Sequence, residues 1–110
     1  MHFIREKKDF FAGIYDPAGR LVYTDHDKFG AAMVDCVLEA YPASGMAPGD
    51  VYWYNDCYAS GGALSHSPDM CFVAPTFDGE ALIGFVANFG HFWDIGGIKP
   101  GTLSPLATEI

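Results

Sequence analysis

The sequence predicts an α+β fold in which β-hairpins and a small mixed sheet accompany one amphipathic helix. Apolar runs separated by short turn sequences indicate the hairpins. A single stretch with apolar residues at three- and four-residue steps indicates the helix. The last 15 residues lack periodicity and indicate an irregular C-terminal arm. Because 110 residues are enough for one domain and not for two, we expect residues 1–110 to form a single domain.

Two hairpins are expected from their turn residues. Asp16-Pro17-Ala18-Gly19 separates the apolar runs 10–15 and 21–23. Asp78-Gly79 separates the runs 70–77 and 81–89. The second of these runs is almost continuously apolar, which is typical of a strand covered on both faces. Between the hairpins, residues 51–54 form a short strand bounded by turn residues.

The helix is expected over residues 29–41, where apolar side chains recur on one face. The polar run Thr24-Asp25-His26-Asp27 precedes it. Asp and Thr cap the free N–H groups at helix N-termini, so we interpret this run as the start of the helix and not as a ligand cluster.

Composition excludes several classes of function. The formal net charge of −8 repels phosphate backbones, so nucleic-acid binding is not expected. No apolar run approaches 18 residues and the first residues do not resemble a signal peptide, so we expect a cytoplasmic protein that does not enter a membrane. Three cysteines without a Cys-x-x-Cys pair indicate neither a disulfide framework nor a zinc ribbon.

A metal site is the strongest chemical candidate. His66 and Asp69 are three residues apart, and the following hairpin can return His91 to the same place. Imidazole and carboxylate groups suit Zn²⁺, Mn²⁺ or Fe²⁺. From spacing alone, the fourth ligand can come from any of three acids: Asp9, Asp56 or Asp94. The alternative is that His66 caps a turn and His91 is a core histidine with its hydrogen bonds satisfied.

Two other sites are less favoured. The glycines of Ser60-Gly61-Gly62 and of Gly96-Gly97 can present N–H groups to an anion, but neither run matches a P-loop, so we interpret them as turns. Cys57 could act as a nucleophile with His66 or His91 as base. Its neighbour Asp56 would raise the pKa of a nearby thiol, so this role is not favoured.

Several motifs, taken in order, resemble the N-terminal part of the hydantoinase B/oxoprolinase family. The resemblance covers nearly the whole chain, and the order of its motifs makes it more specific than any one of them. The motifs are Lys8-Asp9-Phe10, residues 14–22, Gly49-Asp50-Val51-Tyr52, Asn55-Asp56-Cys57-Tyr58, Gly61-Gly62, His66-Ser67-Pro68-Asp69, residues 84–88, and His91 with Asp94-Ile95-Gly96-Gly97.

The resemblance implies a metal bound by two Asp and two His, which fall on Asp9, His66, Asp69 and His91. It thus selects Asp9 among the acids that spacing left open. Zinc is the first expectation, with manganese and iron as alternatives. Asp56 is not expected to bind the ion; it is expected either to contact one of the ligands or to brace a loop.

Family members also work with a companion A-type subunit that binds ATP, so the resemblance implies that this chain does not bind ATP itself. Family chains of the B type are several times longer, which implies that the remaining hydantoinase B-type portion is a separate subunit of a hetero-oligomer. Like Asp56, Asp94 is expected to contact a ligand or to brace one of the loops around the ion.

Among family members, the chain most resembles the small subunits of acetophenone carboxylases. That resemblance implies an ATP-dependent carboxylase, a ligase that forms C–C bonds from an aryl ketone and bicarbonate. Phe92 and Trp93 stand where many relatives have a further histidine, and an aromatic lining suits an aryl ketone. The alternatives are a subunit of an ATP-dependent hydantoin or lactam hydrolase, and a structural metal-binding subunit with the chemistry elsewhere.

Overall fold

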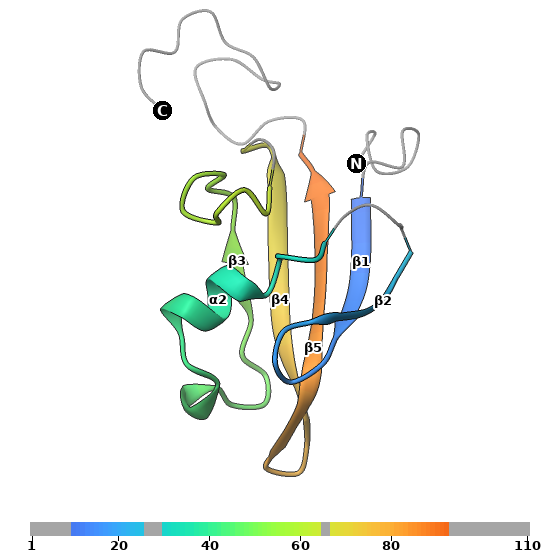
Figure 1. The fold of residues 1–110 in the computed structure, drawn as a ribbon, viewed down its shortest axis with the longest axis vertical. Coiled ribbons are helices and arrows are strands. Elements are labelled where there is room, and N and C mark those ends of the chain that lie inside the picture. The colour runs from blue at the N-terminus through green and yellow to red at the C-terminus, as the bar shows by residue number, and fades with distance from the viewer. Residues whose placement is uncertain (1–9, 26–29, 65–66, 93–110) are drawn as a thin grey trace, which may run out of the picture.

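The chain folds into a five-stranded antiparallel sheet with one short helix on one side of it (Figure 1). The computed structural model describes residues 10–25, 30–64 and 67–92. The spatial order of the strands is β2-β1-β5-β4-β3. Their bounds are β1 Phe10–Tyr15, β2 Leu21–Thr24, β3 Tyr52–Tyr54, β4 Asp69–Asp78 and β5 Ala81–His91. All pairings between these strands are antiparallel, where a mixed sheet was expected. The predicted C-terminal arm lies outside the described residues.

The hairpin of β4 and β5 forms the centre of the sheet. The predicted turn at Asp78-Gly79 is confirmed, and Gly79 has a φ of 61°, a conformation that glycine adopts without a steric penalty. Both strands extend beyond the predicted runs, so that Asp69 begins β4 and His91 ends β5. Both residues therefore belong to strands, although they lie just outside the predicted runs.

The hairpin contains a one-residue irregularity close to its turn. Phe77 pairs with Leu82, whereas Thr76 pairs with Gly84, so Ile83 is an extra residue in β5. At Gly84 the sheet is tight, because a Cβ atom there would overlap the carbonyl oxygen of Tyr15. The irregularity shifts the register of the rest of the hairpin by one residue.

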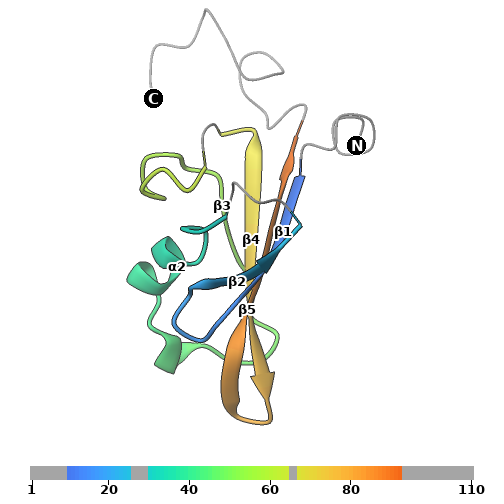
Figure 2. The same cartoon turned by 45° about the vertical axis from the view of Figure 1, so that its right-hand side comes forward.

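The core lies on the inner face of the sheet, the face that α2 covers. Directly paired side chains of β1, β5 and β4 form its layers. Phe11 and Phe89 stack with their ring centroids 6.0 Å apart. In Figure 2 the helix and its flanking loops lie to the left of β4 and β5. The fully buried side chains of the core are Phe11, Tyr15, Met33, Val34, Cys71, Val73 and Phe85.

The helix is shorter than the spacing predicted. α2 covers Asp35–Ala40, and residues 31–34 form turns in place of the first helical residues. A 3₁₀ turn, η1 (Ala43–Gly45), follows it. The tyrosine hydroxyl of Tyr15 donates to the carbonyl of Gly30, and that of Tyr54 donates to the carbonyl of Met33 at 2.7 Å. These bonds tie the segment before α2 to the sheet.

The polar run before the helix does not act as its cap in the described residues. Thr24 belongs to β2. The Asp25 carboxylate accepts a bond from the Ala12 N–H at 3.0 Å, and the Asp25 N–H donates to the Ala12 carbonyl at 3.2 Å. Asp25 therefore extends the pairing of β1 with β2. His26 and Asp27 lie outside the described residues. Within those residues, no helix is long and apolar enough to cross a membrane.

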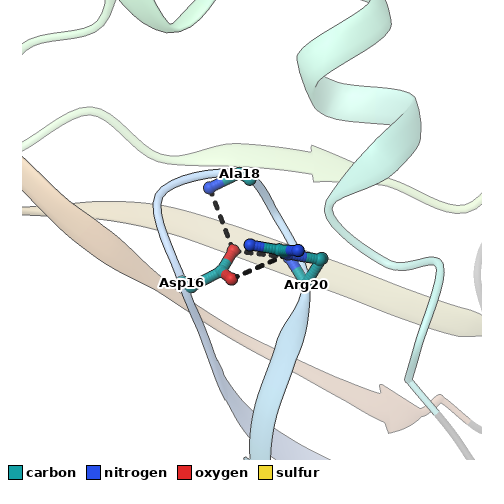
Figure 3. Close-up of polar contacts among 3 residues, drawn as sticks. All are labelled: Asp16, Ala18 and Arg20. Carbon is teal, nitrogen blue, oxygen red and sulfur yellow. Dashed lines mark hydrogen bonds and ion pairs between the residues drawn. The ribbon is translucent and has the colours of Figure 1, made fainter.

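The first hairpin turn is held by one carboxylate (Figure 3). Asp16 Oδ1 accepts bonds from the N–H groups of Ala18, at 3.0 Å, and Arg20, at 2.9 Å. Its other oxygen lies 3.0 Å from Arg20 Nε. The Arg20 backbone N–H, together with its guanidinium and the Ala18 N–H, lowers the pKa of Asp16.

Asp16→Asn is expected to lower the melting temperature at neutral pH, because the amide accepts these bonds less strongly than a carboxylate does. The pKa of Asp16 is lowered on folding, so its contribution to stability is complete above the ordinary aspartate pKa of 3.8 and disappears as the pH falls through the lower pKa of the folded state. Thermal unfolding of both proteins from pH 7 downward measures this. A difference in melting temperature that persists undiminished at the acid end would contradict it.

Candidate metal centre

A buried carboxylate–imidazole pair lies where β4 begins and β5 ends. His91 Nδ1 and Asp69 Oδ1 are 2.9 Å apart. The two residues are only 3% and 5% exposed, respectively. Burying charged or polar groups is costly unless they are paired, and this pair meets that condition. The arrangement joins two of the four predicted metal ligands, and they are 22 residues apart in sequence.

The register of the hairpin places the two side chains together. Asp69 pairs directly with His91, and side chains of directly paired residues point to the same face. If Ile83 were paired regularly with β4, the register near the turn would continue and place Asp69 opposite Gly90. His91 would then lie on the other face of the sheet. The irregularity thus assembles the pair.

The observed pair fits a divalent ion in two ways. Nitrogen and oxygen ligands about 2.1 Å from one ion lie about 3.0 Å apart in octahedral coordination and about 3.4 Å apart in the tetrahedral coordination usual for zinc. The pair therefore matches two ligands of one ion. It also matches an ion-binding histidine whose second nitrogen donates to a carboxylate, an arrangement common around bound metals. Both arrangements use the donor atoms that suit zinc, manganese and iron.

The other predicted site residues are only partly described. Asp9, His66, Trp93 and Asp94 lie outside the described residues. Among the residues that are described, no group of three or more His, Cys, Asp or Glu side chains could hold an ion. Phe92 is half-buried, and its N–H donates to the Pro68 carbonyl at 2.8 Å. This bond continues the pairing of the two segments beyond the strands.

The loop that leads to β4 is braced by polar side chains. Asp56 Oδ1 accepts bonds from the N–H groups of Tyr58, at 2.8 Å, and Ala59, at 2.9 Å, and thereby fixes the turn that follows β3. Asn55 Nδ2 donates to the Ser67 carbonyl at 3.0 Å. No sequence pattern indicates this Asn55 contact, although it joins the end of β3 to the segment just before Asp69.

The cysteines near the site have structural environments. Cys57 Sγ lies 3.5 Å from Ser67 Oγ. Cys71 is fully buried, as expected of a core residue, and burial raises the pKa of its thiol to about 11. A thiol with this pKa stays protonated at neutral pH. Cys71 is therefore a core residue and not a nucleophile.

A cavity of about 380 Å³ lies between α2 and β3, away from the pair. Its lining includes Cys36, Tyr41, Tyr52, Asp56 and Ser60, but neither Asp69 nor His91. The Asp69–His91 pair remains the better candidate for metal chemistry, because it combines two suitable donor atoms in one buried place.

Comparison with known proteins agrees with this architecture. The family model described as Hydantoinase B/oxoprolinase matches residues 2–110. The chain is 33% identical over 112 residues to 5-oxoprolinase 1 of Arabidopsis thaliana, and that alignment covers 97% of this chain. It is 30% identical over 112 residues, with the same coverage, to the 5-oxoprolinase of Saccharomyces cerevisiae. In both cases the chain spans only 8% of the relative's length.

Two solved structures contain a similar fold. The match to the ATP-dependent caprolactamase of Pseudomonas jessenii has a TM-score of 0.72 at 27% identity, over 84% of this chain and 16% of that one. The match to acetone carboxylase, which carries out ATP-dependent acetone carboxylation, has a TM-score of 0.68 at 23% identity, over 92% of this chain and 14% of that one. The sheet and helix described above thus correspond to a small part of much longer chains.

Proposed function

The chain belongs to the hydantoinase B/oxoprolinase family, and from this premise we propose that it is the small metal-binding component of an ATP-dependent ketone carboxylase. In the proposed reaction, acetophenone and bicarbonate give benzoylacetate. The observation that carries the proposal is the buried Asp69–His91 pair in a fold that resembles acetone carboxylase. The complete site includes Asp9, His66, Asp69 and His91.

Chain connectivity supports this ligand set. Phe10 pairs with Gly90, which directly precedes His91. Asp9 is the residue before Phe10, and consecutive Cα atoms are only about 3.8 Å apart. His66 likewise comes just before Ser67, which Asn55 fixes close to the start of β4. We expect all four side chains to reach the same end of the sheet.

The described residues would hold the ion and keep water from its inner side. Asp69 and His91 lie on the inner face beside the core and are almost fully covered by the described residues, which would therefore shield one side of a bound ion. An ion there would supply a Lewis acid for a carbonyl or enolate oxygen. Phe92 and Trp93 are proposed to line the substrate site and to offer apolar contacts for an aryl group. Phe92 also lines a depression on the face of the sheet opposite the pair. Asp94 is proposed to brace the loop that follows.

ATP would be bound by a hydantoinase A-type subunit. The sequence has no P-loop or dinucleotide motif of its own, whereas both matched structures are of ATP-dependent enzymes. We propose a hetero-oligomer that contains this chain, an A-type subunit and the remaining hydantoinase B-type portion.

Opening of a cyclic amide is the second candidate function. It is favoured by the 33% identity to a 5-oxoprolinase over almost the whole chain, and by the likeness to a caprolactamase. In that reaction the same ion would serve to activate water. A third candidate is a structural ion that only orders the loops while the chemistry occurs elsewhere.

The test is an activity comparison on the assembled complex. With ATP and bicarbonate, acetophenone is expected to give benzoylacetate and phosphate, whereas 5-oxoproline, hydantoin and caprolactam give no ring-opened product. Ring opening without carboxylation would replace the first candidate by the second. Elemental analysis of the same preparation is expected to show zinc, and full activity after the metal has been removed would leave only the structural candidate.

A further inference from the structure

The outer face of the sheet carries three largely apolar rows of residues without a charge, next to Asp25 at the edge formed by β2. Its residues are directly paired across the strands, so they share one face, and they lie opposite the face that carries the core. They form three rows, which are Phe10, Gly90 and Met70; Ala12, Asn88, Phe72 and Trp53; and Tyr23, Ile14, Val86 and Ala74. None is charged, although 18% of the residues of the chain are.

Large side chains on this face are exposed in the described structure. Trp53 is 65% exposed, Ile14 51% and Val86 46%. The nearly continuous apolar sequence of β5 indicated a strand covered on both faces, but only its inner face is covered by described residues. A continuous exposed apolar face is unusual on an isolated protein and typical of an interface.

The outer face also has a hollow that can receive a side chain. A depression of about 280 Å³ lies beside Gly90, because glycine has no side chain to fill this position of the first row. Phe10, Phe72 and Asn88 are among the residues that line it. The side chains that contribute most to a protein interface usually insert into depressions of this kind, with aromatic walls and apolar surface around them.

We propose that the outer face is the docking surface for the remaining portion of a hydantoinase B-type polypeptide. This inference rests on the hetero-oligomer of the proposed function. In the matched structures the same fold occupies 14% and 16% of a chain, so in those chains this sheet is joined to much more polypeptide. The partner must present an uncharged surface here, because an unpaired charge buried against these rows would be costly.

Photo-crosslinking in the co-expressed complex tests the docking surface directly. p-Benzoylphenylalanine is placed at Trp53 or Phe72 on the outer face, and at Tyr41 as the matched control. Tyr41 is also aromatic and exposed, but it directly follows α2, on the opposite side of the sheet. Crosslinking to the hydantoinase B-type polypeptide is expected at least about 10-fold more from the outer positions than from Tyr41.

Substitutions give an independent measurement. Ile14→Asp combined with Val86→Asp places two carboxylates side by side on the outer face, because these residues pair directly. The affinity for the B-type polypeptide is expected to fall at least about 30-fold, whereas Tyr41→Asp leaves it within about threefold. Circular dichroism of each variant checks that the fold is retained, and the crosslinking experiment needs no destabilising change.

Three results would overturn the inference. Crosslinks from the outer positions to a second copy of the chain would make this face a homodimer interface. An intact complex without crosslinks from these positions would place the partner elsewhere and leave the proposed function standing. Failure of the two polypeptides to associate at all would remove the hetero-oligomer itself, and the docking surface with it.

Discussion

Asp69→Asn is expected to remove most of the bound metal from the assembled complex and to abolish its activity. The substitution keeps the size of the side chain and removes its charge, at a site only 5% exposed. If Asp69 orients His91, the metal affinity falls about 10- to 100-fold, as is usual for the carboxylate partner of a metal-binding histidine. If Asp69 is itself a ligand, the fall exceeds about 100-fold. Titration with zinc, followed by elemental analysis, measures the change and distinguishes the two arrangements.

The matched control is Asp78→Asn at the other end of β4. Asp78 is exposed in the hairpin turn, so the same chemical change removes a carboxylate from the same strand far from the pair. It is expected to leave the metal content and activity unchanged. A complex with Asp69→Asn that assembles normally and keeps its full metal content would refute the proposed ion.

His91→Ala extends the same test to the imidazole. It removes the hydrogen bond between His91 and the buried Asp69 carboxylate, and so combines loss of a metal donor with a cost of about 1–3 kcal/mol for the lost bond. Added imidazole is expected to restore part of the metal binding. Restoration would separate the chemical role of His91 from its contribution to stability.

Phe11→Ala is expected to produce the largest loss of stability, about 3–5 kcal/mol, because it empties a fully buried aromatic site. The ring stacks on Phe89 from the neighbouring strand. It also supports Gly30, where an added Cβ atom would overlap the ring. Loss of the ring therefore loosens both the β1–β5 contact and the segment that leads to α2. The measurement is unfolding of the purified complex with increasing denaturant, in which the fraction of this chain that remains folded gives the free energy of unfolding.

The control for Phe11→Ala is Tyr58→Ala, since the Tyr58 ring is 72% exposed in the loop after β3. The free energy of unfolding is expected to change by less than about 0.5 kcal/mol. Equal effects of the two substitutions would show that the inner face is not the main core of the protein.

The hairpins could be predicted because their signals are local. Asp16, Gly19, Asp78 and Gly79 occupy turn positions whose backbone conformations depend mainly on the residues themselves. The helix was overestimated for a related reason. Its apolar spacing correctly indicated a buried face, but the contacts of Gly30 with the sheet turn the chain before α2 begins, and no local signal reports a contact between segments so far apart.

The sequence by itself determined the family, the turns, the apolar strands and the choice of His66, Asp69 and His91 as candidate ligands, because these depend on residue type and short spacing. Only the tertiary structure decided that Asp69 and His91 meet on one face. Successive side chains of a strand point to alternate faces of the sheet, so the single extra residue Ile83 determines which face His91 occupies. The tertiary structure also showed that one face of β5 is exposed. Coverage of a face depends on which other polypeptide packs there, and that is a property of the assembly and not of the strand.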